Sequence, residues 1–187
     1  MIIETIFSTI DEQGLPNFAP MGVEWGDEFL TVRPYRNTHT YCNLRRHGYG
    51  VANLTDNVLA YVRCGLYGEV LPCFPAKTVP GVVFEGTCSW RELKVISGDG
   101  SDQRAEFQCR VLYTGKQRDF LGFCRAAGAV IEAAILATRL TLCDPKEIEE
   151  RIRYCWNIVH KTGADNEKRA MQLIDQYVRM RGSHDRG

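Results

Sequence analysis

The segment of this sequence best suited to bind a charged ligand is the polar stretch from Thr31 to His47. It has the pattern of a strand end, a short turn and the start of a helix, with Asn37 placed to cap the helix. Thr38 and Thr40 add hydroxyl donors to the same turn. Because a helix N-terminus carries unpaired backbone N–H groups and the positive end of the helix dipole, the turn suits a phosphate group.

Two arginines of this stretch have the chemistry to hold such a phosphate. Arg33 directly precedes Pro34, and Arg36 lies in the turn itself. A guanidinium can bind phosphate oxygens through two parallel hydrogen bonds, and two such charges would nearly neutralise a phosphate dianion. The same residues equally fit a surface helix capped by Asn37 or Thr38, with solvated arginines, so both interpretations stay open on these residues alone.

Other chemical constellations are weaker. His39, Cys42 and His47 lie on one predicted helix, but His47 follows Cys42 by five positions and leaves the face that the first two share, so we expect no metal site. No dinucleotide-binding or phosphate-loop glycine motif is present. The scattered glutamates of the strands are expected on the solvent face of a sheet: Glu85, Glu92 and Glu106.

The first two thirds of the chain are predicted to be rich in strands. Strand-like runs cover residues 2–10, 18–25, 29–33, 49–54, 82–96 and 104–113. Helices predicted at 38–47 and 56–64 would plug or cap a barrel, and three prolines make residues 71–81 an extended surface loop. Residues 97–102 are predicted to be the loop of a long hairpin. Short, regularly spaced strands favour a barrel.

From Phe123 onward the apolar residues follow a helical period. An alanine-rich helix comes first, and Asp144 with Pro145 then predicts the start of a second helix, with Glu147 completing a capping box. A third helix is predicted beyond Gly163. We therefore expect a barrel domain over residues 1–122, a helical subdomain over 123–181 and a disordered tail over 182–187.

Composition argues against nucleic acid and membranes as partners. The 187 residues include 23 Lys plus Arg and 23 Asp plus Glu, so no net charge favours a polyanion. No run of about 20 apolar residues and no basic leader segment is present, so we expect a cytoplasmic protein. The eight cysteines contain no C-x-x-C pair and are predicted to be free thiols in a reducing compartment, most of them buried.

Three segments together resemble the flavin-reductase-like FMN-binding split barrels. They are Asn-Phe-Ala-Pro-Met-Gly-Val at 17–23, the turn at 33–43, and Gly-Val-Ala-Asn-Leu-Thr-Asp at 50–56. The whole chain is also similar to the family named domain of unknown function 447, including the stretches 128–135 and 154–157. That family occurs in methanogenic archaea and in bacteria that handle C1 units on tetrahydromethanopterin. The implied fold class is mainly β (α+β), an FMN-binding split β-barrel with a C-terminal helical appendage.

The resemblance also implies a site and an assembly. It would place the isoalloxazine ring along one strand, the phosphate at the turn, and the ribityl chain or phosphate near a later strand. The corresponding residues are Ala19, Pro20, Met21 and Gly22 for the ring, Arg33, Asn37, Thr38 and Thr40 for the phosphate, and Asn53 and Thr55 for the last position. It implies a homodimer with FMN near the interface, touched by both chains.

The reaction is less well specified than the cofactor. Reductases of this group commonly carry Lys-Asp-Thr at the turn, and this chain has Arg36-Asn37-Thr38, which weakens any transfer of reductase activity. We expect an FMN-dependent oxidoreductase acting on a small molecule, linked to C1 or tetrahydromethanopterin metabolism, and identify no catalytic side chain. The alternatives are a non-catalytic flavin- or pterin-binding or assembly protein and, less favoured, a haem or pyridoxal-phosphate binder.

Overall fold

The structure is a computed structural model that describes residues 1–98 and 104–184. The chain forms two compact units. One unit comprises Met1–Thr55 and Val70–Phe120, and the other comprises Asp56–Glu69 and the residues from Leu121 onward. The expected boundary at residue 122 lies close to this change of unit, but the short insertion at Asp56–Glu69 interrupts the linear division.

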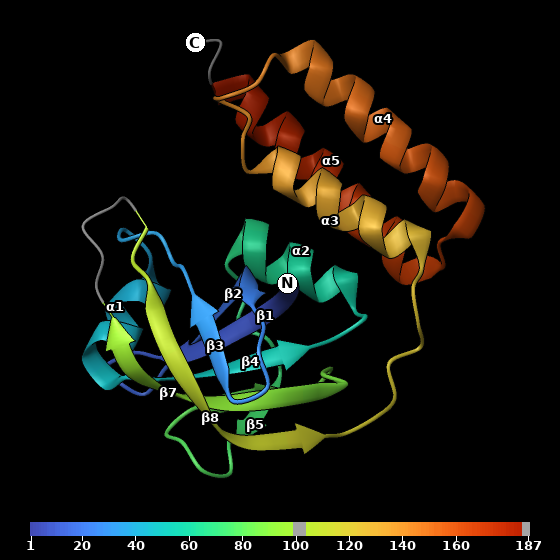
Figure 1. The fold of residues 1–187 in the computed structure, drawn as a ribbon. Coiled ribbons are helices and arrows are strands. Elements are labelled where there is room, and N and C mark those ends of the chain that lie inside the picture. The colour runs from blue at the N-terminus through green and yellow to red at the C-terminus, as the bar shows by residue number, and fades with distance from the viewer. Residues whose placement is uncertain (99–103, 185–187) are drawn as a thin grey trace. The chain divides into compact units, whose positions relative to one another are not determined.

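The first unit is a closed antiparallel barrel with the strand order β1-β2-β3-β8-β7-β4 (Figure 1). This confirms the expected fold class of a barrel followed by helices. The strands are β1 (Ile2–Ile10), β2 (Pro16–Glu24), β3 (Phe29–Val32), β4 (Tyr49–Leu54), β7 (Ser89–Gly98) and β8 (Phe107–Lys116). The hairpin predicted between β7 and β8 is confirmed by their pairing, although residues 99–103 lie outside the described part of the chain.

The barrel core is built from the inward side chains of these strands and from helix α1 (His39–His47). Tyr41 and Leu44 of α1 pack into this core, so α1 plugs the barrel as predicted. At Gly50 an added Cβ would lie 2.5 Å from the ring of Phe7, which explains why a glycine stands there. The buried members are Phe7, Val23, Leu30, Val32, Tyr41, Leu44, Ala52, Leu93, Ala105, Phe107 and Cys109.

A small hairpin covers the outer face of part of the barrel. It pairs β5 (Cys73–Pro75) with β6 (Val82–Phe84), where an extended loop was predicted, and the single strand predicted at 82–96 is divided into β6 and β7. Contacts of β6 with β1 and β4 bury both faces of β1, which accounts for five consecutive buried residues in that strand. A strand covered on both faces loses the alternation of polar and apolar residues by which strands are usually recognised.

Although the barrel is closed, only a short pairing joins it along one edge of β2, which we call its split edge. On one side β2 pairs with β1 over its whole length, and on the other it pairs with β3 only at Val23 and Glu24. Within the described residues, 16–22 therefore have no strand partner on that side. The backbone of this segment is free to face another group.

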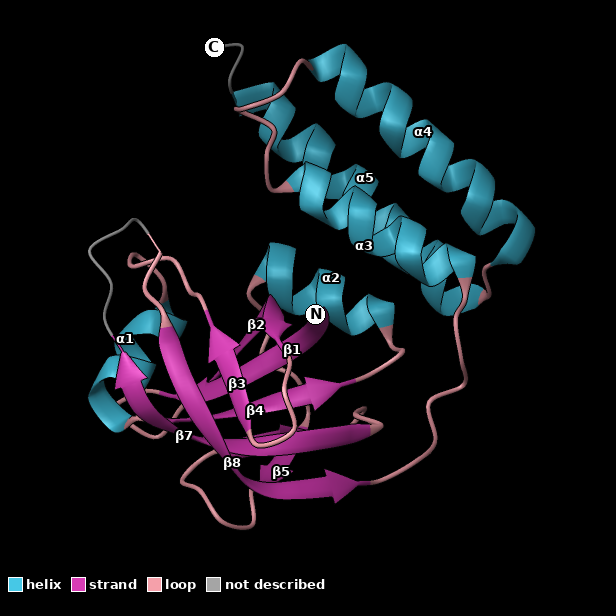
Figure 2. Cartoon of the chain, viewed as in Figure 1, coloured by secondary structure: helices cyan, strands magenta, loops and turns pink. Residues whose placement is uncertain are grey.

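The second unit is helical (Figure 2). Its helices are α2 (Val58–Tyr67), α3 (Arg125–Ala137), α4 (Pro145–Thr162) and α5 (Asp165–His184). Asp144 caps α4 by accepting hydrogen bonds from Lys146 N at 2.8 Å and Glu147 N at 3.4 Å, with Pro145 first in the helix, as predicted. α5 extends to His184, beyond the start of the predicted disordered tail, and residues 185–187 lie outside the described range.

Helix α2 belongs to this helical unit. Val58 and Val62 are members of the same buried cluster as the inner residues of α3, α4 and α5, and the Tyr67 hydroxyl donates to Leu173 O at 2.7 Å. The sequence placed this helix with the barrel domain, to plug or cap the barrel. The compact units group it with the later helices, and its capping of the barrel stays a prediction. Its apolar residues pack against those of helices more than 50 positions later, which a local pattern does not reveal.

No helix in the described residues is long and apolar enough to cross a membrane. All eight cysteines are free, and half of them are buried: Cys64, Cys88, Cys109 and Cys155. Burial raises the pKa of the Cys64 and Cys109 thiols to about 12, so both stay protonated near neutral pH.

Candidate functional site

The split edge of the barrel brings two of the predicted binding segments together. Asn17, at the start of β2, donates from Nδ2 to Thr40 Oγ1 of α1 at 3.2 Å and to Thr9 Oγ1 at 3.4 Å. Asn43 of α1 donates to the same Thr9 hydroxyl at 3.0 Å. This polar cluster fixes the N-terminal turn of α1 beside the free edge of β2.

The four residues predicted to line a flavin ring lie in sequence on β2. Pro20 is exposed, whereas Ala19, Met21 and Gly22 are half-buried. Met21 packs against the barrel core, and its backbone oxygen accepts a hydrogen bond from Thr5 Oγ1 at 3.0 Å. A Cβ at Gly22 would lie 2.8 Å from Ile2 Cγ2, so the segment also has little room for larger side chains on its outer face.

The turn predicted to bind phosphate has the expected helix-start geometry, but Thr38 rather than Asn37 is the cap. Thr38 Oγ1 donates to Tyr35 O at 2.7 Å and accepts from Tyr41 N at 3.3 Å. Asn37 is exposed, and Thr40 is almost fully buried. The backbone N–H groups of the first helical turn that the cap does not satisfy remain available to a ligand, as at any helix N-terminus.

The Arg33 guanidinium is already paired with two carboxylates of the chain. Its guanidinium donates from Nη1 to Glu24 at 2.7 Å and from Nε to Glu106 at 2.9 Å. Hydrogen bonds to these carboxylates raise the pKa of Arg33, and the bond from Arg33 lowers the pKa of Glu24. An incoming phosphate would have to displace two carboxylates that already neutralise this charge.

Asn53 and Thr55 form hydrogen bonds on the side of the barrel that the β5–β6 hairpin covers. Asn53 is fully buried, and its amide donates to Ile6 O at 2.9 Å and accepts from Phe84 N at 3.0 Å. Thr55 Oγ1 donates to Gly86 O at 2.7 Å. Both side chains therefore hold the β6 segment and the turn after it, and are not gathered at the turn of α1.

Glu92 was expected on the solvent face of a sheet, and for this residue the expectation was wrong. Its carboxylate is fully buried and accepts from Lys77 N at 2.8 Å, from Thr78 N and Oγ1 at 2.5 Å each, and from Trp90 Nε1 at 3.1 Å. Burial alone would raise its pKa, but these hydrogen bonds outweigh burial and leave the pKa of Glu92 below its ordinary value. The loop of the β5–β6 hairpin covers the position, so Glu92 fastens this loop to the barrel.

Tyr41 and Arg45 are polar residues beside the site that the motifs did not indicate. The Tyr41 hydroxyl accepts from Arg36 Nη1 at 2.8 Å and from Arg45 Nη1 at 3.3 Å, and the Arg36 guanidinium lies 5.4 Å from the centre of the Tyr41 ring. The four-residue spacing of Tyr41 and Arg45 on a helix is the signal that could have paired them. The turn of α1 is therefore richer in cations than Arg33 and Arg36 alone suggested.

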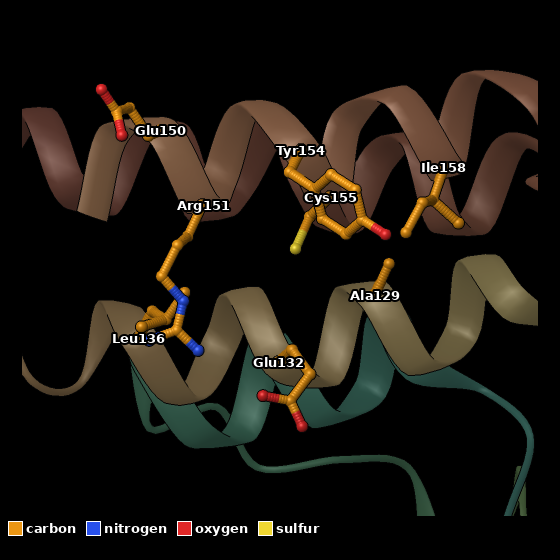
Figure 3. A pocket seen from close by; sticks show the side chains of 8 residues that line it. All are labelled: Ala129, Glu132, Leu136, Glu150, Arg151, Tyr154, Cys155 and Ile158. Atoms are coloured by element: carbon orange, nitrogen blue, oxygen red, sulfur yellow. The ribbon is translucent and has the colours of Figure 1, made fainter. Parts of the chain in front are cut away.

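The helical unit has a groove of its own between α3 and α4, with a volume of about 430 Å³ (Figure 3). Leu136, Cys155 and Ile158 give it apolar walls, and the Arg151 side chain extends from α4 toward α3. Arg151 also lies 3.8 Å from Glu147. None of the predicted binding residues lines this groove.

Comparison with known protein families identifies the chain. Residues 3–118 match the N-terminal domain of the protein family of unknown function DUF447, and residues 124–176 match the second domain defined for the same family. The chain belongs to the DUF447 family. The two matched regions meet close to the change between the barrel and helical units of this DUF447 protein.

One solved structure supports the fold of nearly the whole chain, and others support the fold of about two thirds of it. An FMN-bound DUF447 protein from Methanosarcina mazei is 27% identical, with a TM-score of 0.83 and 94% of each chain covered. A flavoredoxin from Methanosarcina acetivorans is 15% identical, with a TM-score of 0.57 over 65% of this chain and 72% of that one. An FMN-binding protein from Thermus thermophilus is 17% identical, with a TM-score of 0.54 over 61% and 70%. The last two share the split-barrel fold with this DUF447 protein, and only the first extends over nearly the whole chain.

Proposed function

We propose that this DUF447 protein is an FMN-binding flavoprotein. The observation that carries the proposal is the likeness over 94% of both chains to an FMN-bound member of the same family. The free edge of β2 and the N-terminal turn of α1, held together by Asn17 and Thr40, supply a place for the flavin that agrees with this likeness.

The chain's residues fit FMN in part. The open N–H groups at the start of α1 and the nearby exposed Asn37 suit a phosphate, and the free backbone edge at 16–22 suits the polar rim of an isoalloxazine ring. We assign the ring to Ala19–Gly22 and the phosphate to the turn at 36–40. Arg33, Asn53 and Thr55 are not in this assignment, because their side chains are engaged elsewhere in the barrel.

The experiment that tests FMN binding is the visible absorption spectrum of the purified protein, followed by mass analysis of the molecule released on denaturation. We expect flavin bands and released FMN. A colourless protein that also leaves the fluorescence of added FMN unquenched would contradict the proposal.

We further propose an oxidoreductase that acts on a small molecule. Bound FMN supplies the electron transfer, and the protein supplies orientation and electrostatics, so no catalytic side chain is required. The family's occurrence in C1-handling organisms suggests tetrahydromethanopterin metabolism as the setting. Stopped-flow reduction of the flavin by pyridine nucleotides or a reduced deazaflavin tests this step, and a flavin that no donor reduces and no acceptor reoxidises would favour the non-catalytic alternative, a flavin- or pterin-binding protein.

The assembly that we propose is a homodimer in which both chains touch each FMN. Its support is the resemblance to the dimeric split-barrel flavoproteins. Light scattering of the FMN-loaded protein should give twice the mass of 21.2 kDa, and a monomer with bound flavin would contradict this assignment.

A further inference from the structure

Arg91 of β7 is a cation on the inner face of the barrel. In the strand register it lies across from Ala52 of β4 and Thr114 of β8, and it is two positions before Leu93. Ala52 and Leu93 belong to the buried barrel core, and cross-strand partners share one face of a sheet, so the Arg91 side chain begins on the inner face. Arg91 is half-buried and Thr114 is exposed, so solvent reaches this part of the inner face.

The Arg91 guanidinium lies over the ring of Trp25, the residue that follows β2. Its central carbon is 5.5 Å from the centre of the ring, and its Nη1 donates to Trp90 O at 3.3 Å. Trp25 packs against the barrel core, and its backbone N donates to Met1 O at 2.8 Å, so the ring is a fixed support. Two strands separate β7 from β2 in either direction around the barrel, so Arg91 extends across the barrel to the end of β2.

The charge of Arg91 has no carboxylate partner in residues 1–98 and 104–184. Among its N–H groups, the hydrogen bond to Trp90 O is the single one that these residues satisfy. Burial lowers the pKa of Arg91, and the charge of Asp27, which forms no ion pair with it, offsets part of this effect. A half-buried guanidinium with unused donors is costly until an anion completes it.

Two other arginines of the barrel show how this cost is usually avoided. Arg33 is paired with Glu24 and Glu106, and Arg110 is exposed to water. Arg91 has neither a carboxylate partner nor full exposure. This combination, beside an exposed hydroxyl on the same face, is what distinguishes its position.

We propose that Arg91 anchors a carboxylate site in the barrel and holds the acidic group of the substrate on which the flavin acts. A carboxylate accepts two parallel hydrogen bonds from a guanidinium, and the Thr114 hydroxyl supplies a further donor on the same face. A single cation near Asp27 suits a monoanion better than a phosphate dianion.

The substrate part of this assignment rests on the proposed function. Trp25 is three residues beyond Gly22, the last residue of the segment that we assign to the flavin ring, which is about 10 Å along an extended chain. A small organic acid of that length extends from the guanidinium to the edge of the ring. The mouth of a β-barrel is also a common place for a small-molecule site.

The test titrates the full-length protein with benzoate and with benzamide, a neutral molecule of the same shape, and follows tryptophan fluorescence. Because the guanidinium lies over Trp25, an anion bound to it changes the emission of that ring, and Trp25→Phe shows which part of the signal comes from Trp25. We expect a saturable response to benzoate and none to benzamide. Arg91→Gln should raise the benzoate Kd by roughly 10-fold or more, as for loss of a charge-assisted hydrogen bond.

Arg110→Gln is the matched control, because it removes an exposed arginine of the same barrel that also lies over an aromatic ring, at 5.6 Å from Phe29. We expect it to leave the benzoate Kd unchanged. Arg91→Lys keeps the charge and loses the planar fork, so its Kd should lie between those of the wild type and Arg91→Gln. This variant also keeps the test available if Arg91→Gln does not fold, which the thermal unfolding midpoint shows.

A second titration adds benzoate to the FMN-loaded protein and follows the visible flavin bands. We expect the bands to shift in the wild type and in Arg110→Gln but not in Arg91→Gln, whose FMN Kd should equal that of the wild type. Benzoate that binds at Arg91 without shifting the bands would overturn the assignment to the substrate.

The carboxylate site itself would be overturned by a wild type without a benzoate response, by equal responses to benzoate and benzamide, or by an unchanged benzoate Kd in both Arg91 variants. A wild type that binds no FMN would instead overturn the proposed function, and the tryptophan titration would still decide the carboxylate site on its own.

Discussion

Around the β5–β6 hairpin, buried polar side chains meet partners within the chain, whereas the N-terminal turn of α1 has backbone N–H groups that its Thr38 cap does not satisfy. On the hairpin side, Glu92 accepts four hydrogen bonds and Asn53 both donates and accepts. At α1, two arginines converge on one tyrosine oxygen. Both regions belong to the same compact barrel unit, so the difference is one of local hydrogen bonding.

The comparison separates polar residues that build the fold from those that are free to bind. A buried polar group that is satisfied within the protein contributes to stability, and its removal leaves its partners without acceptors. A group with spare donors contributes little to the fold until an anion completes it. Substitutions on the hairpin side should therefore change the free energy of unfolding, and those at α1 should change affinity.

The largest effect is expected for Glu92→Leu. It leaves the buried donors from Lys77, Thr78 and Trp90 without an acceptor, and we expect the free energy of unfolding to fall by about 3–5 kcal/mol. Urea denaturation measures the change, with the exposed Glu85→Gln as the control. A loss as small as that of the control would mean that the carboxylate does not fasten the hairpin.

A smaller loss of stability is expected for Asn53→Leu. The substitution removes the acceptor of Phe84 N and the donor to Ile6 O, which should cost about 2–3 kcal/mol. Flavin affinity measured under conditions where the variant is fully folded should stay within a factor of about two, because the side chain does not reach the turn of α1. A selective loss of FMN affinity without a loss of stability would return Asn53 to the cofactor site.

The pH dependence of stability sharpens the same contrast. Because the folded-state pKa of Glu92 is lowered, its stabilising contribution is complete above the ordinary value of 4.5 and is lost as the pH falls through the lowered folded-state pKa. The difference in unfolding free energy between the wild type and Glu92→Gln should therefore shrink below pH 4.5 and stay constant from there to neutrality. A difference that grows on acidification would contradict the assigned direction.

The smallest effect is expected for Arg33→Gln. This exposed arginine is already neutralised by two exposed carboxylates, so its loss should change the FMN Kd by less than about threefold and the unfolding midpoint by little. Asn37→Ala, in the turn that we assign to the phosphate, provides the reference. A larger effect on FMN affinity at Arg33 than at Asn37 would reverse the assignment of the two positions.

Much of the barrel could be predicted from local patterns. The bounds of β1 and β4 were predicted to the residue, because runs of β-branched and aromatic residues end there at turn-forming sequences. The cap of α4 was also predicted, since Asp144 and Pro145 act on the backbone immediately beside them. The hairpin of β5 and β6 was not, because proline-rich strands of three residues look like a loop until another surface pairs or covers them.

The candidate site was located by sequence and specified by tertiary structure. Residue types alone determined that the turn after β3 would open a helix with exposed N–H groups and several cations, since capping depends on neighbours within a few positions. That Arg33 is engaged by carboxylates was decided by strand pairing. Val32 pairs with Val23 and with Phe107, which brings Glu24 and Glu106 to Arg33 from 9 and 73 positions away. Hydrogen bonds and ion pairs act over a few ångströms of space, so partners that are distant in the chain can be assigned only once the fold has brought them together.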